Sequence, residues 1–351
     1  MKSTLLILIC LLTFLCCFGQ SNDLPDIKPD IITLKNFKEI PSAKSGISDI
    51  IVIDARFDSS SLGFYQTNSE KNYSIITETS LPNEISSFLK DYLQVTNNGK
   101  SIVMVLKKLW LTNECIEEPN DEANKKNANG SWLKGIITKF EFYCSYEDGY
   151  TPLYRFDSIF SGTINIKDYS KEYLHNALTI SIEKLIAADL NNLSSARKKM
   201  TLQDIIAYNT KQFNIPVLNT NVYKKGVYKT FAEFKMNTPS FNNYEIKEDK
   251  LTETLFIKDG KGEYPVRDVW GFCDGNNLYI KSSDNYFELT KKQNTFICFA
   301  AKDLSRSRHV KAGNIIMFGV LGGGMGKGNK KVSYKINRKL YALDMETGEI
   351  Y

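Results

Sequence analysis

The sequence has few of the residues from which catalytic and metal sites are usually built. It contains two histidines, His175 and His309, and no GxSxG, HExxH or CxxC pattern. These patterns mark serine hydrolases, zinc proteases and zinc or redox sites, so their lack argues against those classes. His175 stands beside the apolar stripe of an expected helix and should be solvated. His309 follows two arginines, which disfavour a charged imidazole. We therefore expect no metal, no cofactor and, on balance, no enzyme.

Long apolar runs are also scarce. The main one, Leu5 to Phe18, follows a single lysine at the amino terminus. That pattern predicts a secretory signal peptide, and small residues at the right positions favour cleavage after Gly19. A lipoprotein acylated at Cys16 or Cys17 is the alternative, although the residue before a lipidated cysteine is normally small. No later run approaches the ~20 residues of a spanning helix. We expect a mature chain exported to the periplasm or the cell surface, without a transmembrane helix.

Four cysteines remain after the signal peptide, namely Cys115, Cys144, Cys273 and Cys298. An exported chain can oxidise its thiols, and one disulfide in each half would fit. The other interpretation treats them as small buried hydrophobic residues. The sequence leaves both open.

The string "FGVLGGGMGKGNKK", residues 318–331, looks most like a functional motif. It is not a phosphate-binding loop, because Leu321 stands where the first glycine is needed and Gly328 replaces the Ser or Thr that would hold magnesium. The dinucleotide pattern fails as well. We interpret the segment as a hairpin loop, or else as an apolar tip with basic flanks that contacts an anionic membrane surface. The residues of such a contact would be Arg306, Arg308, Lys311, Met317, Leu321, Lys327, Lys330 and Lys331.

Periodicity predicts an α+β first half. We expect strands at 49–57, 73–77 and 101–111, and a hairpin formed by 132–146 and 152–166. Two helices should alternate with them. One begins after Ser80, and the other begins near 168–170 with an apolar stripe from Leu174 to Ile186. The expected domain is an N-terminal sheet covered by these two helices.

The second half shows a different pattern of expected helices and strands. Thr201 with Asp204, and Thr230 with Glu233, predict two capped helices in a connector. Beyond them, short strands near 244, 255, 269, 278, 287, 296, 315, 332 and 340 alternate with turn signals, which is typical of a β-sandwich or a partial barrel. The last strand should end in a terminal hairpin that turns at 346–348. The expected divisions are a signal peptide (1–19), a polar lead-in (20–47), an α+β domain (48–195), a helical connector (196–240) and a β-rich domain (241–351).

The most distinctive string of the β-rich half is "WGFCDGNN", residues 270–277. We expect a hairpin turn at Asp274 and Gly275, with Trp270 and Phe272 on one face of the incoming strand. Packing is the favoured role of this aromatic pair, and ligand stacking is the alternative.

Charge is distributed unevenly along the chain. Residues 20–215 hold 22 Lys+Arg and 25 Asp+Glu, a net charge of −3, whereas residues 216–351 hold 22 and 15, a net charge of +7. Such asymmetry bears on partners rather than on fold. The partners that fit are an envelope protein, a glycan or an anionic membrane surface. Nucleic acid is not expected, because the basic stretch lacks a recognised module.

The strings "IIVIDARFDSSSLGFYQ", "KGVYKTFAEFKMNTPS" and "DVWGFCDGNNLYI" resemble uncharacterised exported proteins of Bacteroidota-type bacteria. The order of elements in the first half also resembles small periplasmic domains of envelope accessory proteins. Neither resemblance implies an established activity or catalytic residues.

Two functional hypotheses follow. The first is a non-catalytic cell-envelope protein, a binding or accessory module with a basic C-terminal face. The second is an exported hydrolase of unrecognised family that uses carboxylates at the domain junction. A concave acidic cleft would favour the hydrolase, and a flat basic face would favour the binding module.

Overall fold

The computed structural model describes residues 24–35, 46–93, 95–112, 134–162, 166–187, 198–249, 252–260, 262–266, 268–282, 285–301 and 338–351. The expected signal peptide, Cys115, His309, the glycine string 318–331 and the expected strands near 315 and 332 lie outside these residues.

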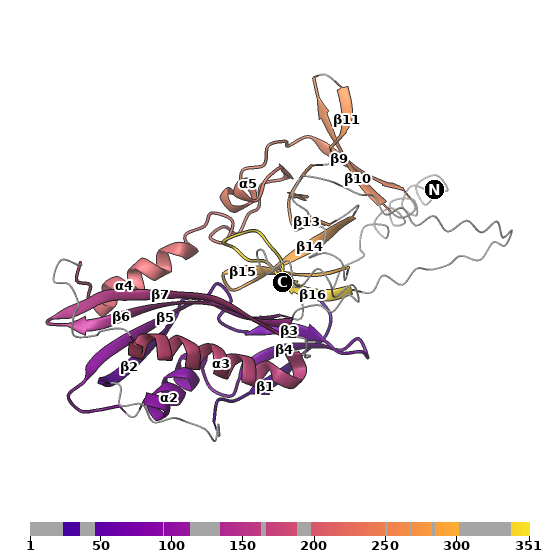
Figure 1. Ribbon diagram of the computed structural model, residues 1–351. Coiled ribbons are helices and arrows are strands. Elements are labelled where there is room, and N and C mark those ends of the chain that lie inside the picture. The colour runs from indigo at the N-terminus through magenta and orange to yellow at the C-terminus, as the bar shows by residue number, and fades with distance from the viewer. Residues whose placement is uncertain are drawn as a thin grey trace, which may run out of the picture.

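The first half of the chain forms a seven-stranded sheet (Figure 1). Its strands are β1 (Ile27–Ile32), β2 (Ile47–Asp54), β3 (Gly63–Gln66), β4 (Asn72–Thr77), β5 (Lys100–Thr112), β6 (Lys134–Tyr146) and β7 (Gly149–Gly162). The order is β1-β4-β3-β5-β6-β7, and β2 pairs with the first part of β5. Strands β2 and β3 both run parallel to β5, while β5, β6 and β7 form an antiparallel meander. Strand β5 is therefore the centre of the sheet.

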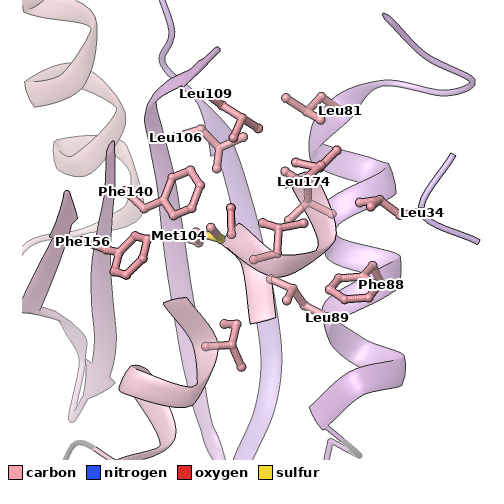
Figure 2. Close-up of a cluster of buried hydrophobic side chains, with 14 of the residues drawn as sticks. Leu34, Leu81, Phe88, Leu89, Met104, Leu106, Leu109, Phe140, Phe156 and Leu174 are labelled. Atoms are coloured by element: carbon pink, nitrogen blue, oxygen red, sulfur yellow. The ribbon is translucent and has the colours of Figure 1, made fainter. Parts of the chain in front are cut away.

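Helices α2 (Leu81–Leu93) and α3 (Ile166–Ala187) pack on one face of this sheet. The apolar residues of α2 recur at helical spacing, and Ile85, Phe88 and Leu89 are buried because they share one side. They meet the alternating side chains of β5, such as Met104, in the largest apolar cluster (Figure 2).

The opposite face of β5 is covered by α4 (Leu202–Thr210), whose Ile205 is buried against Val103 and Val105. Thr201 and Asp204 form the predicted capping box at the start of α4, so that expectation is confirmed. A short 3-10 turn, η2 (Lys211–Phe213), follows directly.

The second half contains two further sheets. A six-stranded antiparallel sheet has the order β16-β15-β14-β13-β12-β8, and a smaller one has the order β11-β10-β9. The strands are β8 (Gly226–Tyr228), β9 (Tyr244–Asp249), β10 (Thr252–Asp259), β11 (Gly262–Val266), β12 (Gly271–Cys273), β13 (Leu278–Ser282), β14 (Asn285–Lys292), β15 (Thr295–Ala301) and β16 (Arg338–Ala342). One face of the six-stranded sheet packs on α5 (Phe231–Met236) through Phe234, and the other packs on the three-stranded sheet through Phe272.

The two halves meet where β16 lies beside β3 (Figure 1). Phe64 and Trp110 from the first half pack against Ile297, Leu340 and Ala342 from the second half. The Gln66 amide also donates to the backbone oxygen of Arg338 at 2.8 Å. The first sheet thus lies between α2 and α3 on one face, and α4 with the second half on the other.

The fold is β-rich with several sheets and few helices, in line with the coarse expectation. Several details differ. Strand β1 lies inside the segment expected to be a loose lead-in, because it pairs in parallel with β4. Strand β8 lies inside the expected helical connector, and it pairs with β12 as part of the second sheet.

Two side-chain expectations are also wrong. His175 is not simply solvated, because its ring lies edge-on to Phe88 at 5.3 Å between α2 and α3. Trp270 and Phe272 do not share a face: Trp270 packs with the cluster around Phe234, while Phe272 packs with the cluster on the other side of the sheet. Trp270 precedes β12, so strand alternation does not apply to it.

Among the described helices, none combines the length and apolar character needed to cross a bilayer.

Candidate functional site: a pocket at the junction of the two halves

A pocket of about 480 Å³, counting its open mouth, lies where the two halves meet. From the first half, it is lined by the loop after β2 and by the middle of β5, including Phe57, Lys107 and Trp110. The C-terminal turn contributes Met345 and Tyr351 from the second half, and the lining is mostly apolar.

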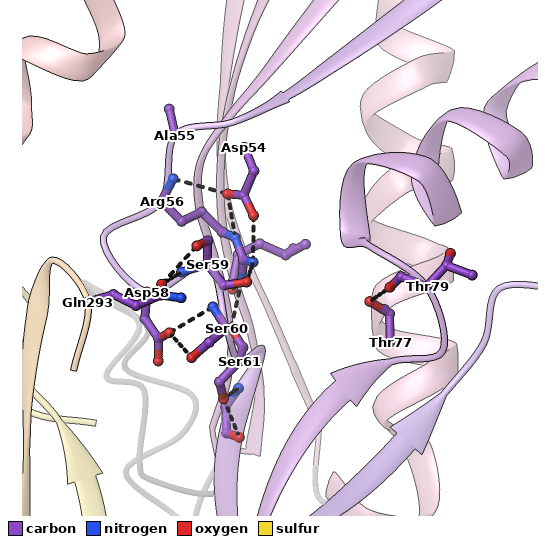
Figure 3. A network of polar contacts seen from close by, with 12 residues as sticks. Asp54, Ala55, Arg56, Asp58, Ser59, Ser60, Ser61, Thr77, Thr79 and Gln293 are labelled. Atoms are coloured by element: carbon purple, nitrogen blue, oxygen red, sulfur yellow. Dashed lines mark hydrogen bonds and ion pairs between the residues drawn. The ribbon is translucent and has the colours of Figure 1, made fainter.

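The loop after β2 is fixed in place by Arg56, whose side chain is only 4% exposed. Its guanidinium donates to both carboxylate oxygens of Asp54, at 2.9 and 2.8 Å, and to the backbone oxygens of Ser59, Ser61 and Leu109 (Figure 3). This set of hydrogen bonds uses the planar fork of arginine fully. Arg56 thereby ties the loop to β5 and forms a rigid wall of the pocket.

Asp58 continues the same loop. Its Oδ1 accepts hydrogen bonds from the backbone nitrogen and the hydroxyl of Ser60, at 2.9 and 2.7 Å (Figure 3). Its Oδ2 lies 3.3 Å from Nζ of Lys292, which belongs to β14 in the second half. Beside this pair, Ser59 donates to the side-chain oxygen of Gln293. Asp58 therefore helps to join the halves.

The C-terminal turn supplies the facing wall. Asp344 accepts hydrogen bonds from the backbone nitrogen of Glu346 at 2.9 Å and from the hydroxyl of Thr347 at 3.1 Å, which closes the turn. Asp344 also pairs with Lys108 of β5, and the Lys108 ammonium lies 4.7 Å from the ring centre of Tyr351. The terminal hairpin predicted at 346–348 is confirmed by the bridge between Leu343 and Ile350.

Glu346 projects from the same turn toward the first sheet. It forms an ion pair of 2.7 Å with Lys139 of β6. Burial, together with the nearby Asp344 carboxylate, raises the pKa of Glu346 above its ordinary value. Each of the three carboxylates that line the pocket thus has a lysine partner from the other half of the chain.

Lys107 is the exception among these charges. It is the extra residue of a β-bulge, because the pairing of β5 with β6 shifts register between Leu106 and Lys108. Its ammonium donates to Oδ1 of Asn209 in α4 at 2.9 Å, and Asn209 is fully buried. Burial lowers the pKa of Lys107, and this outweighs the opposing effect of Glu141 and Glu346. Groups with perturbed pKa values in a pocket are candidates for function.

Among the described residues, none of those predicted from sequence as site residues lines the pocket. The basic and apolar residues proposed for membrane contact, from Arg306 to Lys331, are outside the described part of the chain. Trp270 packs on Phe234 with ring centres 4.2 Å apart, and Phe272 is 4% exposed. Both rings therefore pack against protein neighbours in the two apolar clusters.

The three described cysteines do not line the pocket either. Cys144 and Cys273 are buried thiols, and burial raises the pKa of each. Cys298 is buried in the same cluster as Cys273. Cys273 is a free thiol in the structure.

Sequence reasoning missed Lys107. The available signal was the pair Lys107-Lys108 within the apolar strand "SIVMVLKKLWL". In a regular strand these neighbours would face opposite sides, and one would enter the core beneath α2 and α3. Two adjacent lysines in a strand buried on both faces therefore indicate a bulge.

Comparison with known proteins gives little functional information. The model of a family of unknown function, DUF6563, matches residues 226–351, which span β8 to the C-terminal turn but not β5. No curated protein matches the sequence.

Two solved structures are similar in part. One is an uncharacterized protein, with 8% identity and a TM-score of 0.26 over 45% of this chain and 99% of that one. The other is a protein from Xanthomonas campestris of family-model DUF330, with 7% identity and a TM-score of 0.29 over 46% of this chain and 93% of that one. Scores this low carry no argument about fold or function.

Proposed function

We propose that this chain is an exported, non-catalytic binding protein of the cell envelope, and that the junction pocket is its binding site. Export is supported by the charged start and the apolar run from Leu5 to Phe18. The observation that carries the proposal is the pairing of the pocket carboxylates: Asp58, Asp344 and Glu346 each have a lysine partner across the junction.

Such pairing suits binding better than hydrolysis. A carboxylate that acts as general base or nucleophile must reach the substrate, whereas these hold the two halves together. The exposed surface of the pocket is mostly apolar, and the charged side chains that line it are engaged in hydrogen bonds or ion pairs. The pocket is neither a concave acidic cleft, which would favour the hydrolase, nor a flat basic face, which would favour the binding module.

One observation favours the hydrolase as a second candidate. Burial moves the pKa of Glu346 upward and that of Lys107 downward in the same pocket, as in acid–base sites. A Glu346→Gln variant separates the two functions. If the purified chain turns over an envelope substrate and this variant does not, the protein is an enzyme.

The direct test places a photo-crosslinking phenylalanine analogue at Phe57, which lines the pocket. The control places it at Lys71, which is exposed beside β4. We expect the Phe57 form, in native envelopes, to capture a defined molecule that the Lys71 form does not capture, and that molecule to bind the unmodified chain when purified. Circular dichroism checks that both forms are folded. Equal capture at both positions, or none at Phe57, would refute the proposal.

A further inference from the structure

The charges around the junction pocket leave one cation without a carboxylate partner. In the described part of the chain, Arg56 pairs with Asp54, Lys108 with Asp344, Lys139 with Glu346 and Lys292 with Asp58. Lys107 instead donates to the neutral amide oxygen of Asn209. A lysine ammonium has three donors, so Lys107 can still donate to a bound ligand.

The surroundings of Lys107 hold it in this position. Asn209 Nδ2 donates to the backbone oxygen of Ile205 at 2.9 Å, which orients Oδ1 toward the lysine. The bulge in β5 adds one residue to the strand and leaves Lys107 as a lining residue of the pocket. The lysine is therefore positioned by buried structure on two elements, which is how preorganised binding groups are built.

The remaining acidic neighbours do not neutralise Lys107. Glu346 is engaged by Lys139. Glu141 of β6 accepts a hydrogen bond from the Tyr143 hydroxyl at 3.1 Å and, among the described residues, forms no ion pair with Lys107, although its charge acts on Lys107 at longer range. The lowered pKa of Lys107 is consistent with a cation that is partly desolvated and incompletely compensated.

Apolar side chains also line the pocket, beside the paired carboxylates. Phe57 and Trp110 line it from the first half, and Met345 and the ring of Tyr351 line it from the second. A ligand with a purely polar body would lose its hydration against these side chains without gaining hydrogen bonds in exchange. A ligand that joins one negative group to an apolar body would satisfy both parts.

We infer that the junction pocket binds a small amphipathic carboxylate, with the carboxylate group on Lys107 and the apolar body between Trp110 and Met345. This inference rests on the proposed function and names the ligand class of the same site. A single carboxylate suits Lys107, which among the described cations that line the pocket is the one without a carboxylate partner, and both halves of the chain contribute to the contact.

Octanoate is the first probe, measured by isothermal titration calorimetry on the full mature chain. We expect saturable binding of octanoate, and at least about tenfold weaker binding of 1-octanol, octylamine and acetate, because an ion-paired hydrogen bond and the apolar body both contribute. Equal affinity for octanoate and 1-octanol would overturn the inference. So would the absence of octanoate binding.

Variants assign the carboxylate to Lys107. Lys107→Met should weaken octanoate binding at least about tenfold, and Lys107→Arg should keep most of it. Lys28→Met, on an exposed residue of β1, is the matched control and should change nothing. If Lys107→Met proves unfolded, Lys107→Arg and the probe series on the wild type remain decisive. Capture at Phe57 without octanoate binding would reject the ligand class alone, whereas failure of the Phe57 capture would reject the proposed function.

Discussion

Replacement of Arg56 by methionine tests whether the loop after β2 is held as the structure indicates. The side chains of Arg56 and Asp54 are 4% and 11% exposed, and their ion pair is bidentate. Loss of the guanidinium leaves the Asp54 carboxylate buried without a cation, although the backbone nitrogen of residue 56 still donates to it, at a cost of about 3–5 kcal/mol. Three backbone oxygens also lose their donor. We expect the free energy of unfolding to fall by about 3–5 kcal/mol, from the ion pair alone.

The chain offers a matched control for this variant. Arg155 and Asp157 form an ion pair of 2.9 Å with the same sequence spacing, but their side chains are 48% and 58% exposed. An exposed pair contributes about 0–1 kcal/mol, so Arg155→Met should have little effect. Urea unfolding followed by far-ultraviolet circular dichroism measures both variants. If Arg56→Met costs no more than Arg155→Met, the argument about this loop is wrong.

Three further predictions concern packing, backbone and pH. Leu89→Ala should cost about 2–5 kcal/mol in urea unfolding because Leu89 is fully buried in the largest cluster, whereas Val95→Ala, at a 41% exposed residue, should cost less than about 0.5 kcal/mol. Gly348→Ala should lower Tm, because Gly348 has φ +80° and an added Cβ would lie 2.6 Å from the Phe231 ring; Gly260→Ala, with open space around it, should not. Burial lowers the pKa of Lys339 to about 8, so the unfolded chain binds more protons between that pH and the ordinary lysine pKa near 10.5. The free energy of unfolding of the wild type should therefore rise relative to that of Lys339→Met as the pH increases over this range. A difference between the two that does not change with pH would contradict the assignment.

Local signals in the sequence predicted much of the secondary structure. The stripe of α2 and the capping box of α4 depend on residues three or four positions apart, so they can be recognised without knowledge of the fold. The hairpin of β6 and β7 and the C-terminal hairpin depend on turn residues, which are equally local. The short strands β1 and β8 were missed because each is defined by its pairing partner, β4 and β12, rather than by its own pattern.

The candidate site shows the same division. The sequence by itself determined that residues 100–112 form a buried strand and that the last residues form a tight hairpin. It also showed that only two histidines are present to take part in catalysis. Only the tertiary structure decided that Asp344 and Glu346 lie against Lys108 and Lys139, more than two hundred residues away, and that Lys107 is left facing Asn209. Each of these contacts depends on where the second half docks on the first sheet. Docking is set by the summed burial of Phe64, Trp110 and Leu340, which no local pattern encodes.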